Sequence, residues 1–486
     1  MIFTMFIDGQ WHTGDQNNLK DVTSPATGEV LGQIPFGVSE DVDRAVRAAR
    51  RASKSLERMT VFERAELCQR IANAIEVNRD RLAKLLSLEH GKPLYTEAYG
   101  EVDSCVAAFR EASEQIKWMD SKIIPTRDPN KRALAFRRPR GVYGIITPWN
   151  FPIGCACVYY LAPGLAAGNS IVWVPSPSTS AIASELMRCI ASVEFPDGAI
   201  NLVIGEGSVV GDALVIHELT DAIGFTGSTQ TGRIIASRAG AKPCLLELGG
   251  NGPTIVLDDA DIELAAEAIA RGSFSNAGQI CTSTERVLVH KSVADRLAEA
   301  LQAHANNIRL GDPLDPSTTM GPVHNESIAK KVMDHLEDAV YKGAKILTGG
   351  KIQSNRPTNL YLEPTVVDYV AETAKLNTDE TFGPVAPLIR FANIDDLHRL
   401  VASSPYRLSA AVFSRDVERA LLLAESLKFG FVNINEAGNY WETQIPAGGT
   451  SGSWSGYGRT GGKWSIEEMS EICTVVLNLP GGKHYD

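Results

Sequence analysis

The sequence predicts an α/β protein built on a parallel sheet with helices on its faces. From residue 142 onward, apolar runs of strand length alternate with pieces of helix length, which is the pattern of βαβ units. The runs are apolar throughout, as strands covered on both faces are. The candidate strands of this first series are 142–147, 170–174, 200–204 and 222–226.

A second βα series begins after Gly249. It predicts strands at 254–257 and 285–290, followed by helices at 261–274 and 292–308. Because the chain has 486 residues and a domain usually has about 100–200, two or three domains are expected.

The segments outside these two series are also patterned. Residues 5–35 predict short strands, since Asp8-Gly9 and Thr27-Gly28 are turn dipeptides. Long amphipathic helices and two outlying strands complete the prediction. The helices are 40–57, 60–89 and 94–119, and the strands are 132–139 and 473–479.

Composition excludes several classes of protein. Apolar residues make up 44% of the chain and charged residues 22%, as in a globular protein. The net charge of -11 argues against a nucleic-acid or anionic-membrane surface. The first nine residues lack the basic region of a signal peptide. The uncharged stretch 141–184 is interrupted by prolines and glycines, so it predicts buried elements and no membrane span.

The eight cysteines predict reduced thiols in a cytoplasmic protein. None stands in a Cys-x-x-Cys pair, and the chain is too long to be a disulfide-stapled miniature. The nine histidines are scattered without the spacing of zinc ligands, so no metal site is expected.

A glycine-containing loop is a candidate phosphate site. Gly224 to Arg233 follows a predicted strand and opens a helix, whose free N–H groups can receive a pyrophosphate. The loop matches neither Gly-x-Gly-x-x-Gly nor the P-loop, so a purely structural turn stays an alternative.

Three further motifs carry candidate catalytic side chains. Cys281 follows Gly278-Gln279-Ile280, a setting unlike those of the other cysteines. Glu247 is a lone carboxylate at an apolar strand end, where burial raises the pKa toward that of a general base. Asn150 lies in a proline-bounded loop and carries an amide that can donate to an oxyanion. A cysteine needs such partners because its thiolate is the nucleophile.

The chain order of the Asn150 loop, the Gly227/Gly232 loop, Glu247 and Cys281 resembles that of the aldehyde dehydrogenase superfamily. Other family-like segments lie along essentially the whole chain: residues 25–29, 89–93, 380–384, 446–449 and 455–459. The resemblance implies NAD(P)-dependent oxidation of an aldehyde to a carboxylic acid. Cys281 would form a thiohemiacetal and then a thioester, Asn150 would hold the oxyanion, and Glu247 would activate the deacylating water.

The resemblance also implies a fold, a cofactor site and an assembly. The expected fold is a Rossmann-like cofactor domain (1–118 and 140–249), a second α/β catalytic domain (250–465) and a small β oligomerisation arm (119–139 and 466–486). A homodimer or homotetramer is expected. Glu380 would bind the nicotinamide ribose. The full expected cofactor set is Thr147, Pro148, Trp149, Gly227, Ser228, Gly232, Leu248, Gly249, Glu380 and Phe382.

The sequence departs from the family in three places. Val174 and Pro177 replace the Lys and Glu of the usual Lys-Pro-x-Glu, which leaves NAD or NADP open, with NAD favoured because no cation replaces the Lys. The helix after Asn150 is one residue longer near Tyr159, which predicts a local bulge. The loop 449–455 is about two residues longer than in relatives.

Aromatic and flanking side chains are candidates for the substrate pocket: Tyr159, Tyr160, Ile280, Thr282 and Trp441, with Tyr440 and Trp454 further out. Arg286 could meet a distal carboxylate, as in some semialdehyde enzymes, although it is widespread in the family. The aldehyde itself is not predicted. A CoA-acylating semialdehyde dehydrogenase is the alternative, which Glu247 disfavours, and a catalytically silent structural paralogue is a remote one.

Overall fold

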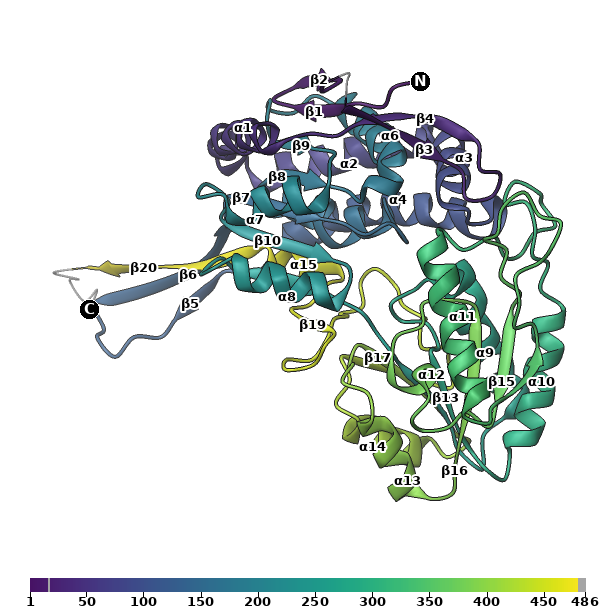
Figure 1. Ribbon diagram of the computed structural model, residues 1–486. Helices are drawn as coiled ribbons and strands as arrows, with labels where there is room; N and C mark the ends of the chain where they lie inside the picture. Colours follow the sequence, from purple (N-terminus) through teal and green to yellow (C-terminus); the bar gives the residue numbers. More distant parts are fainter. Residues whose placement is uncertain (16–17, 480–486) are drawn as a thin grey trace.

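The computed structural model describes residues 1–15 and 18–479, and it contains two large sheets that lie in separate halves of the molecule (Figure 1). The first sheet has eight strands, of which the five central ones run parallel. In spatial order they are β19 (Gly456–Tyr457), β11 (Cys244–Glu247), β10 (Ala222–Thr226), β7 (Val142–Ile146), β8 (Ser170–Val174), β9 (Ile200–Leu202), β1 (Met5–Ile7) and β2 (Gln10–His12).

Helices pack around this sheet and bury a shared apolar core. The region predicted as one helix over 60–89 is two helices that meet at Asn78, whose side-chain amide donates to the Ala74 carbonyl and so competes with the helix backbone. The helices are α1 (Ser39–Arg58), α2 (Val61–Val77), α3 (Arg79–His90), α4 (Tyr99–Gln115), α5 (Ala162–Ala167), α6 (Ser180–Ala191), α7 (Asp212–Ile216) and α8 (Thr229–Arg238).

The second sheet has seven strands, all parallel to their neighbours except β14. They are β14 (Lys345–Thr348), β15 (Thr365–Asp368), β16 (Val385–Phe391), β13 (Arg286–His290), β12 (Pro253–Val256), β17 (Ser409–Phe413) and β18 (Phe431–Ile434). Its helices are α9 (Ile262–Phe274), α10 (Ala294–Asn306), α11 (Glu326–Tyr341), α12 (Lys375–Thr378), α13 (Ile394–Ala402) and α14 (Val417–Ser426).

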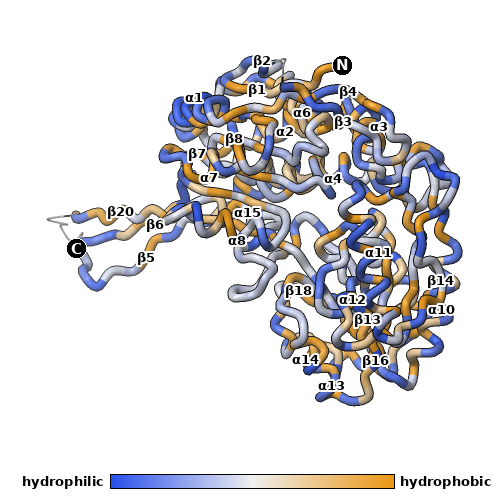
Figure 2. The backbone as a smooth tube through the Cα atoms, in the orientation of Figure 1, coloured by the Kyte–Doolittle hydropathy of each residue, from blue (hydrophilic) through white to orange (hydrophobic). Residues whose placement is uncertain are grey.

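A three-stranded antiparallel arm projects from the body (Figure 1). It consists of β5 (Lys122–Ile124), β6 (Lys131–Pro139) and β20 (Ser470–Asn478), and β20 pairs with β6 along its whole length. Hydrophobic and hydrophilic residues both occur along it (Figure 2), and Ile123 and Ile472 are 73% and 65% exposed. A separate hairpin of β3 (Leu19–Thr23) and β4 (Val30–Pro35) lies near the N-terminus.

The α/β prediction is confirmed, but the last part of the catalytic range packs elsewhere. β19 belongs to the first sheet, and α15 (Gly462–Glu468) packs against α5 and buries Ile466 in the first core. The reason is that the chain returns along β11 before it enters the arm.

The bulge predicted near Tyr159 is present as a π-helix, Ala156–Leu161. The amide of Ala162 donates to the Cys157 carbonyl five residues back, so one extra residue is accommodated within the helix. Shorter π-helical turns begin α4 (Leu94–Ala98) and α7 (Gly207–Gly211). Among the described residues, no helix is both long and apolar enough to cross a bilayer.

Candidate active site

A cavity of about 650 Å³ lies between elements of the two sheets. It is lined by the segments that follow β7, β10 and β11 and by the segment that carries Cys281. In open α/β sheets, ligands bind outside the carboxyl ends of the parallel strands. The three predicted catalytic side chains, Asn150, Glu247 and Cys281, all line this cavity.

The backbone before Cys281 is held in an unusual conformation. Asn276, Ala277 and Gly278 have positive φ angles of 52°, 52° and 72°. Such angles cost about 1–3 kcal/mol for residues other than glycine, so the surroundings must hold them. At Gly278 a side chain would also collide with the Gly383 carbonyl, which explains a glycine there.

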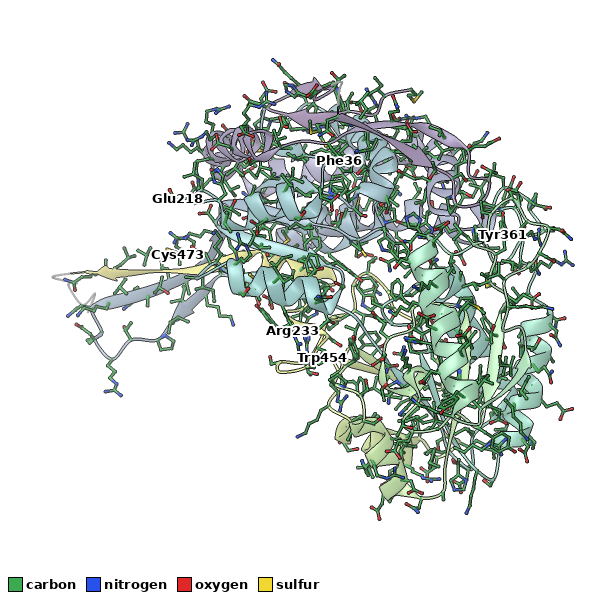
Figure 3. The ribbon with its side chains drawn as sticks, viewed as in Figure 1. Phe36, Glu218, Arg233, Tyr361, Trp454 and Cys473 are labelled. Atoms are coloured by element: carbon green, nitrogen blue, oxygen red, sulfur yellow. The ribbon has the colours of Figure 1, made fainter. Side chains whose placement is uncertain are left out.

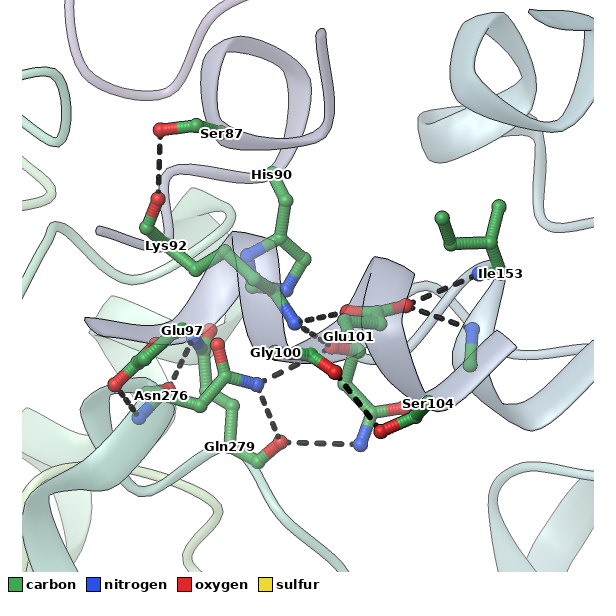
Figure 4. A network of polar contacts seen from close by, with 12 residues as sticks. Ser87, His90, Lys92, Glu97, Gly100, Glu101, Ser104, Ile153, Asn276 and Gln279 are labelled. Carbon is green, nitrogen blue, oxygen red and sulfur yellow. Dashed lines mark hydrogen bonds and ion pairs between the residues drawn. The ribbon is translucent and has the colours of Figure 1, made fainter. Parts of the chain in front are cut away.

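Glu97 and Asn276 form the first part of a polar network beside the cavity (Figure 4). The Asn276 amide N–H donates to Glu97 Oε1 at 2.7 Å. The Asn276 side-chain nitrogen donates to the carbonyls of Asn150 and Gln279, both at 3.2 Å. Asn276 therefore ties the turn before Cys281 to the loop that carries Asn150.

A buried ion pair forms the second part of this network (Figure 4). Lys92 Nζ lies 2.6 Å from Glu101 Oε2 and 2.9 Å from the Asn150 carbonyl oxygen that it donates to. Both side chains are 1% exposed. Glu101 Oε1 accepts from the amides of Ile153 and Gly154, so the pair fixes the main chain on both sides of Phe151.

The side chain of Asn150 donates to the Gln279 carbonyl at 3.0 Å. This amide is buried at 6% exposure and reaches across to the Cys281 segment. An amide donor at this place can transfer its hydrogen bond to an oxyanion that forms next to Cys281.

Glu247 is buried at the end of β11, and among the described residues its Oε1 has no hydrogen-bond partner. Burial raises its pKa well above the usual value, Arg459 opposes this shift, and Glu468 adds to it. The adjacent Gly250 packs against the Cys281 carbonyl, where a side chain would collide. This close approach brings the carboxyl-bearing strand end to the cysteine segment.

The Cys281 thiol is neutral in this environment. Burial raises its pKa to about 12, and the charges of Glu247 and Glu380 raise it too. A thiol needs a proton acceptor to become a nucleophile. Glu247 is a nearby carboxyl group whose own raised pKa suits it to accept a proton.

Glu380 and Phe382 also line the cavity. Glu380 Oε1 accepts from the Gly250 amide at 2.8 Å. Phe382 has a φ of 62° and meets Trp149 edge-on at 5.7 Å. The turn is anchored by Glu285, which accepts from the amides of Thr381 and Phe382 at 2.7 and 2.9 Å.

Most of the predicted cofactor and pocket residues line the cavity, and three do not. Those that line it are Pro148, Trp149, Tyr159, Gly227, Ser228, Leu248, Gly249, Ile280, Thr282, Glu380, Phe382 and Trp441. Thr147 is buried and accepts from the Trp173 indole at 2.8 Å, and Gly232 lies beneath Leu248. Tyr160 is fully buried, with its hydroxyl 2.7 Å from Thr226 Oγ1, so the expectation that it lines the pocket is wrong.

Three other candidates from the sequence also lie away from the cavity. Arg286 is fully buried and donates to the carbonyls of Asn251 and Leu400 at 3.0 and 2.9 Å. Tyr440 is 44% exposed and bonds Glu442. Trp454, in the longer loop before β19, packs under Arg233 of α8 at 4.4 Å (Figure 3). The longer loop therefore packs against α8.

Sequence reasoning missed the network of Lys92, Glu97, Glu101 and Asn276. It also missed a cluster of three rings, in which Trp149 stacks on His324 at 4.7 Å and His90 lies 5.2 Å from His324 and 5.9 Å from Trp149. The signal available was the segment Glu89 to Pro93, which places three ionisable residues directly after an amphipathic helix. Within the described residues, no group of three or more His, Cys, Asp or Glu could hold a metal ion.

Comparison with known proteins identifies the class. The model of the aldehyde dehydrogenase family matches residues 11–475. The 3-sulfolactaldehyde dehydrogenase of Pseudomonas putida is 38% identical over 97% of this chain and 96% of its own length. The NADP(+) succinate-semialdehyde dehydrogenase of Escherichia coli K12 is 36% identical over 97% of each chain. A crystal structure of betaine aldehyde dehydrogenase from Staphylococcus aureus with NAD+ is 34% identical, covers 99% of this chain and 96% of that one, and has a TM-score of 0.94.

The chain belongs to the aldehyde dehydrogenase family. It is an oxidoreductase that oxidises aldehydes to carboxylic acids with NAD(P), and the CoA-acylating alternative is not favoured. The resemblance drawn from the sequence motifs is thereby confirmed.

Proposed function

We propose that Cys281 is the nucleophile, Asn150 the oxyanion donor and Glu247 the general base. The observation that carries this proposal is the convergence of all three on one cavity, with an unpaired Glu247 carboxylate oxygen. Glu247 accepts the thiol proton as sulfur attacks the aldehyde carbonyl, and Asn150 donates to the resulting oxyanion. After oxidation, Glu247 loses the thiol proton to solvent and then takes a proton from the water that hydrolyses the thioester.

The nicotinamide cofactor accepts the hydride when it is bound. We propose that Glu380 and the turn of Gly227 and Ser228 hold it. Ser228 caps α8, where its Oγ accepts from Thr231, and the first turn of that helix offers further N–H groups to a pyrophosphate. Val174 and Pro177 stand where the family usually carries a Lys and a Glu, and NAD is favoured over NADP because no cation replaces the Lys.

Two variants test the mechanism. Cys281→Ala should abolish NAD(P)H formation while it keeps the circular dichroism spectrum of the wild type. Glu247→Gln should still give a burst of NAD(P)H, slower than that of the wild type because the thiol has lost its proton acceptor. Slow turnover should follow, because acyl transfer from the thioester to water lacks its base. Wild-type turnover by either variant would refute the assigned role.

We also propose a cytoplasmic homodimer or homotetramer and the domain division 1–118 with 140–249, 250–465, and 119–139 with 466–486. Two separate apolar cores and the projecting arm support this division, except that β19 and α15, at the end of the 250–465 range, pack with the first sheet. The exposed apolar residues of the arm support a role in assembly, since an uncovered sheet edge invites pairing. Sedimentation of a monomer at micromolar concentration would refute the assembly.

A further inference from the structure

Among the described residues that line the cavity, the one cationic side chain is Lys331 of α11. Burial raises the pKa of Glu380 and of Glu285, and the charge of Lys331 opposes this rise, so Lys331 lies near Glu380 on the proposed cofactor side. Arg286, the arginine that could have bound a substrate carboxylate, donates instead to main-chain carbonyls away from the cavity.

Four carboxyl groups line the cavity: Glu97, Glu101, Glu247 and Glu380. Lys92 pairs with Glu101 at 2.6 Å. Burial raises the pKa of Glu97 and of Glu247, which favours their neutral forms. Apart from Lys331, none of the described lining side chains is cationic, so an anionic substrate would lose its hydration here without gaining a cationic partner. Such a buried charge is costly unless it is paired.

The remaining wall is aromatic and aliphatic. Tyr159 and Trp441 meet edge to face at 5.8 Å, and Val158, Ile280 and Phe431 complete the apolar lining. The Trp441 indole N–H already donates to the Ile445 carbonyl at 2.7 Å, so it is not free for a polar substrate group. Apolar area of this kind favours an uncharged substrate.

We propose that the enzyme selects uncharged, mainly apolar aldehydes and discriminates against aldehydes that carry a carboxylate or sulfonate. The proposal rests on the assignment of the cavity as the active site, and it names the chemical class of the substrate there. Tyr159, Val158 and Trp441 contact the apolar part, and among the described residues that line this end no cation is placed to pair with a distal anion.

Two matched pairs of aldehydes test charge at nearly constant shape. The first pair is methyl 4-oxobutanoate and 4-oxobutanoate, and the second is 3,3-dimethylbutanal and its trimethylammonium isostere, betaine aldehyde. The neutral member of each pair should have at least a tenfold higher kcat/KM. A preference for the anion in the first pair, or for the cation in the second, would overturn the proposal.

The same pairs should be titrated calorimetrically into Cys281→Ala, which separates substrate preference from turnover. Tighter binding of the neutral members supports the proposal even if the catalytic assignment fails, and equal or weaker binding contradicts it.

As a matched test of the electrostatics, Val158→Arg should raise the kcat/KM ratio of 4-oxobutanoate to its ester at least tenfold. Val158→Met, which adds length without charge, should leave that ratio unchanged. An equal change in both variants would show that shape, and not charge, sets the preference.

Discussion

Replacing Lys92 by Met is the sharpest test of how the active site is held. Lys92 donates both to Glu101 and to the Asn150 carbonyl, and neither side chain of the ion pair is more than 1% exposed. Met keeps the length and the apolar stem, so the variant removes the charge and two hydrogen bonds.

The expected loss of stability follows from this burial. Breaking a buried ion pair by removing one partner costs about 3–5 kcal/mol, because the other charge is left unpaired. The effect on catalysis comes through Asn150, whose main chain loses its 2.9 Å contact. A displacement of a catalytic group by about 1 Å can reduce a rate by about 10²-fold.

The assay combines urea denaturation with a pre-steady-state burst of NAD(P)H. Lys92→Met should lower the urea midpoint and slow the burst by about 10–100-fold. The control is Lys92→Met with Glu101→Gln, which removes both charges but keeps a side-chain oxygen that can accept from the amides of Ile153 and Gly154. That double variant should recover much of the stability but not the burst rate, since the Asn150 carbonyl still lacks its donor. A wild-type burst rate in either variant would refute the positioning role.

Four other outcomes are expected. Because burial raises the pKa of Glu247 and a base must be ionised, the rate of thioester hydrolysis should rise with pH through that pKa, and a flat profile in stopped-flow deacylation would contradict this role. Because the pKa of Glu247 is higher in the folded state than in the unfolded state, its protonation stabilises the folded protein at low pH, and this stabilisation should be lost as pH rises through the folded-state pKa of Glu247. Glu247→Gln should abolish this pH dependence of the free energy of unfolding, measured by denaturation across pH. Gly250→Ala should slow the burst by at least about 100-fold through its collision with Cys281, with an unchanged circular dichroism spectrum, and a normal burst would refute the close packing. Ile472→Asp with Val476→Asp should shift sedimentation to a smaller species if the arm assembles subunits, and an unchanged coefficient would exclude it.

The sequence predicts those site residues that stand in a local motif, and it does not predict contacts between residues that are far apart in the chain. Cys281, Glu247 and Asn150 are visible because each stands in a local pattern of glycine, proline or apolar neighbours. The Lys92 network is not visible in this way, since it joins residues that are 9 and 58 positions apart. Helix and strand positions follow from periodicity, which is local too.

The orientation of side chains could be predicted only in part. The extra residue near Tyr159 indicated a bulge, and a π-helix is present. The sequence did not say which of the two adjacent tyrosines would face the cavity, because that depends on the helix rotation at the bulge. Likewise, Arg286 is a cation near Cys281 in sequence, but the strand direction turns it into the core.

The π-helix Ala156–Leu161 has a consequence for how this pocket can evolve. A helix turns by about 100° per residue, and the π-helix accommodates its extra residue locally, so losing one residue there would change which side chains of 156–161 face the cavity. A single-codon deletion within the π-helix would thus exchange the residue presented to the aldehyde while the composition of the wall stayed almost the same. The π-helix would therefore allow a single deletion to change the substrate specificity of the enzyme, without a substitution at any residue that contacts the substrate.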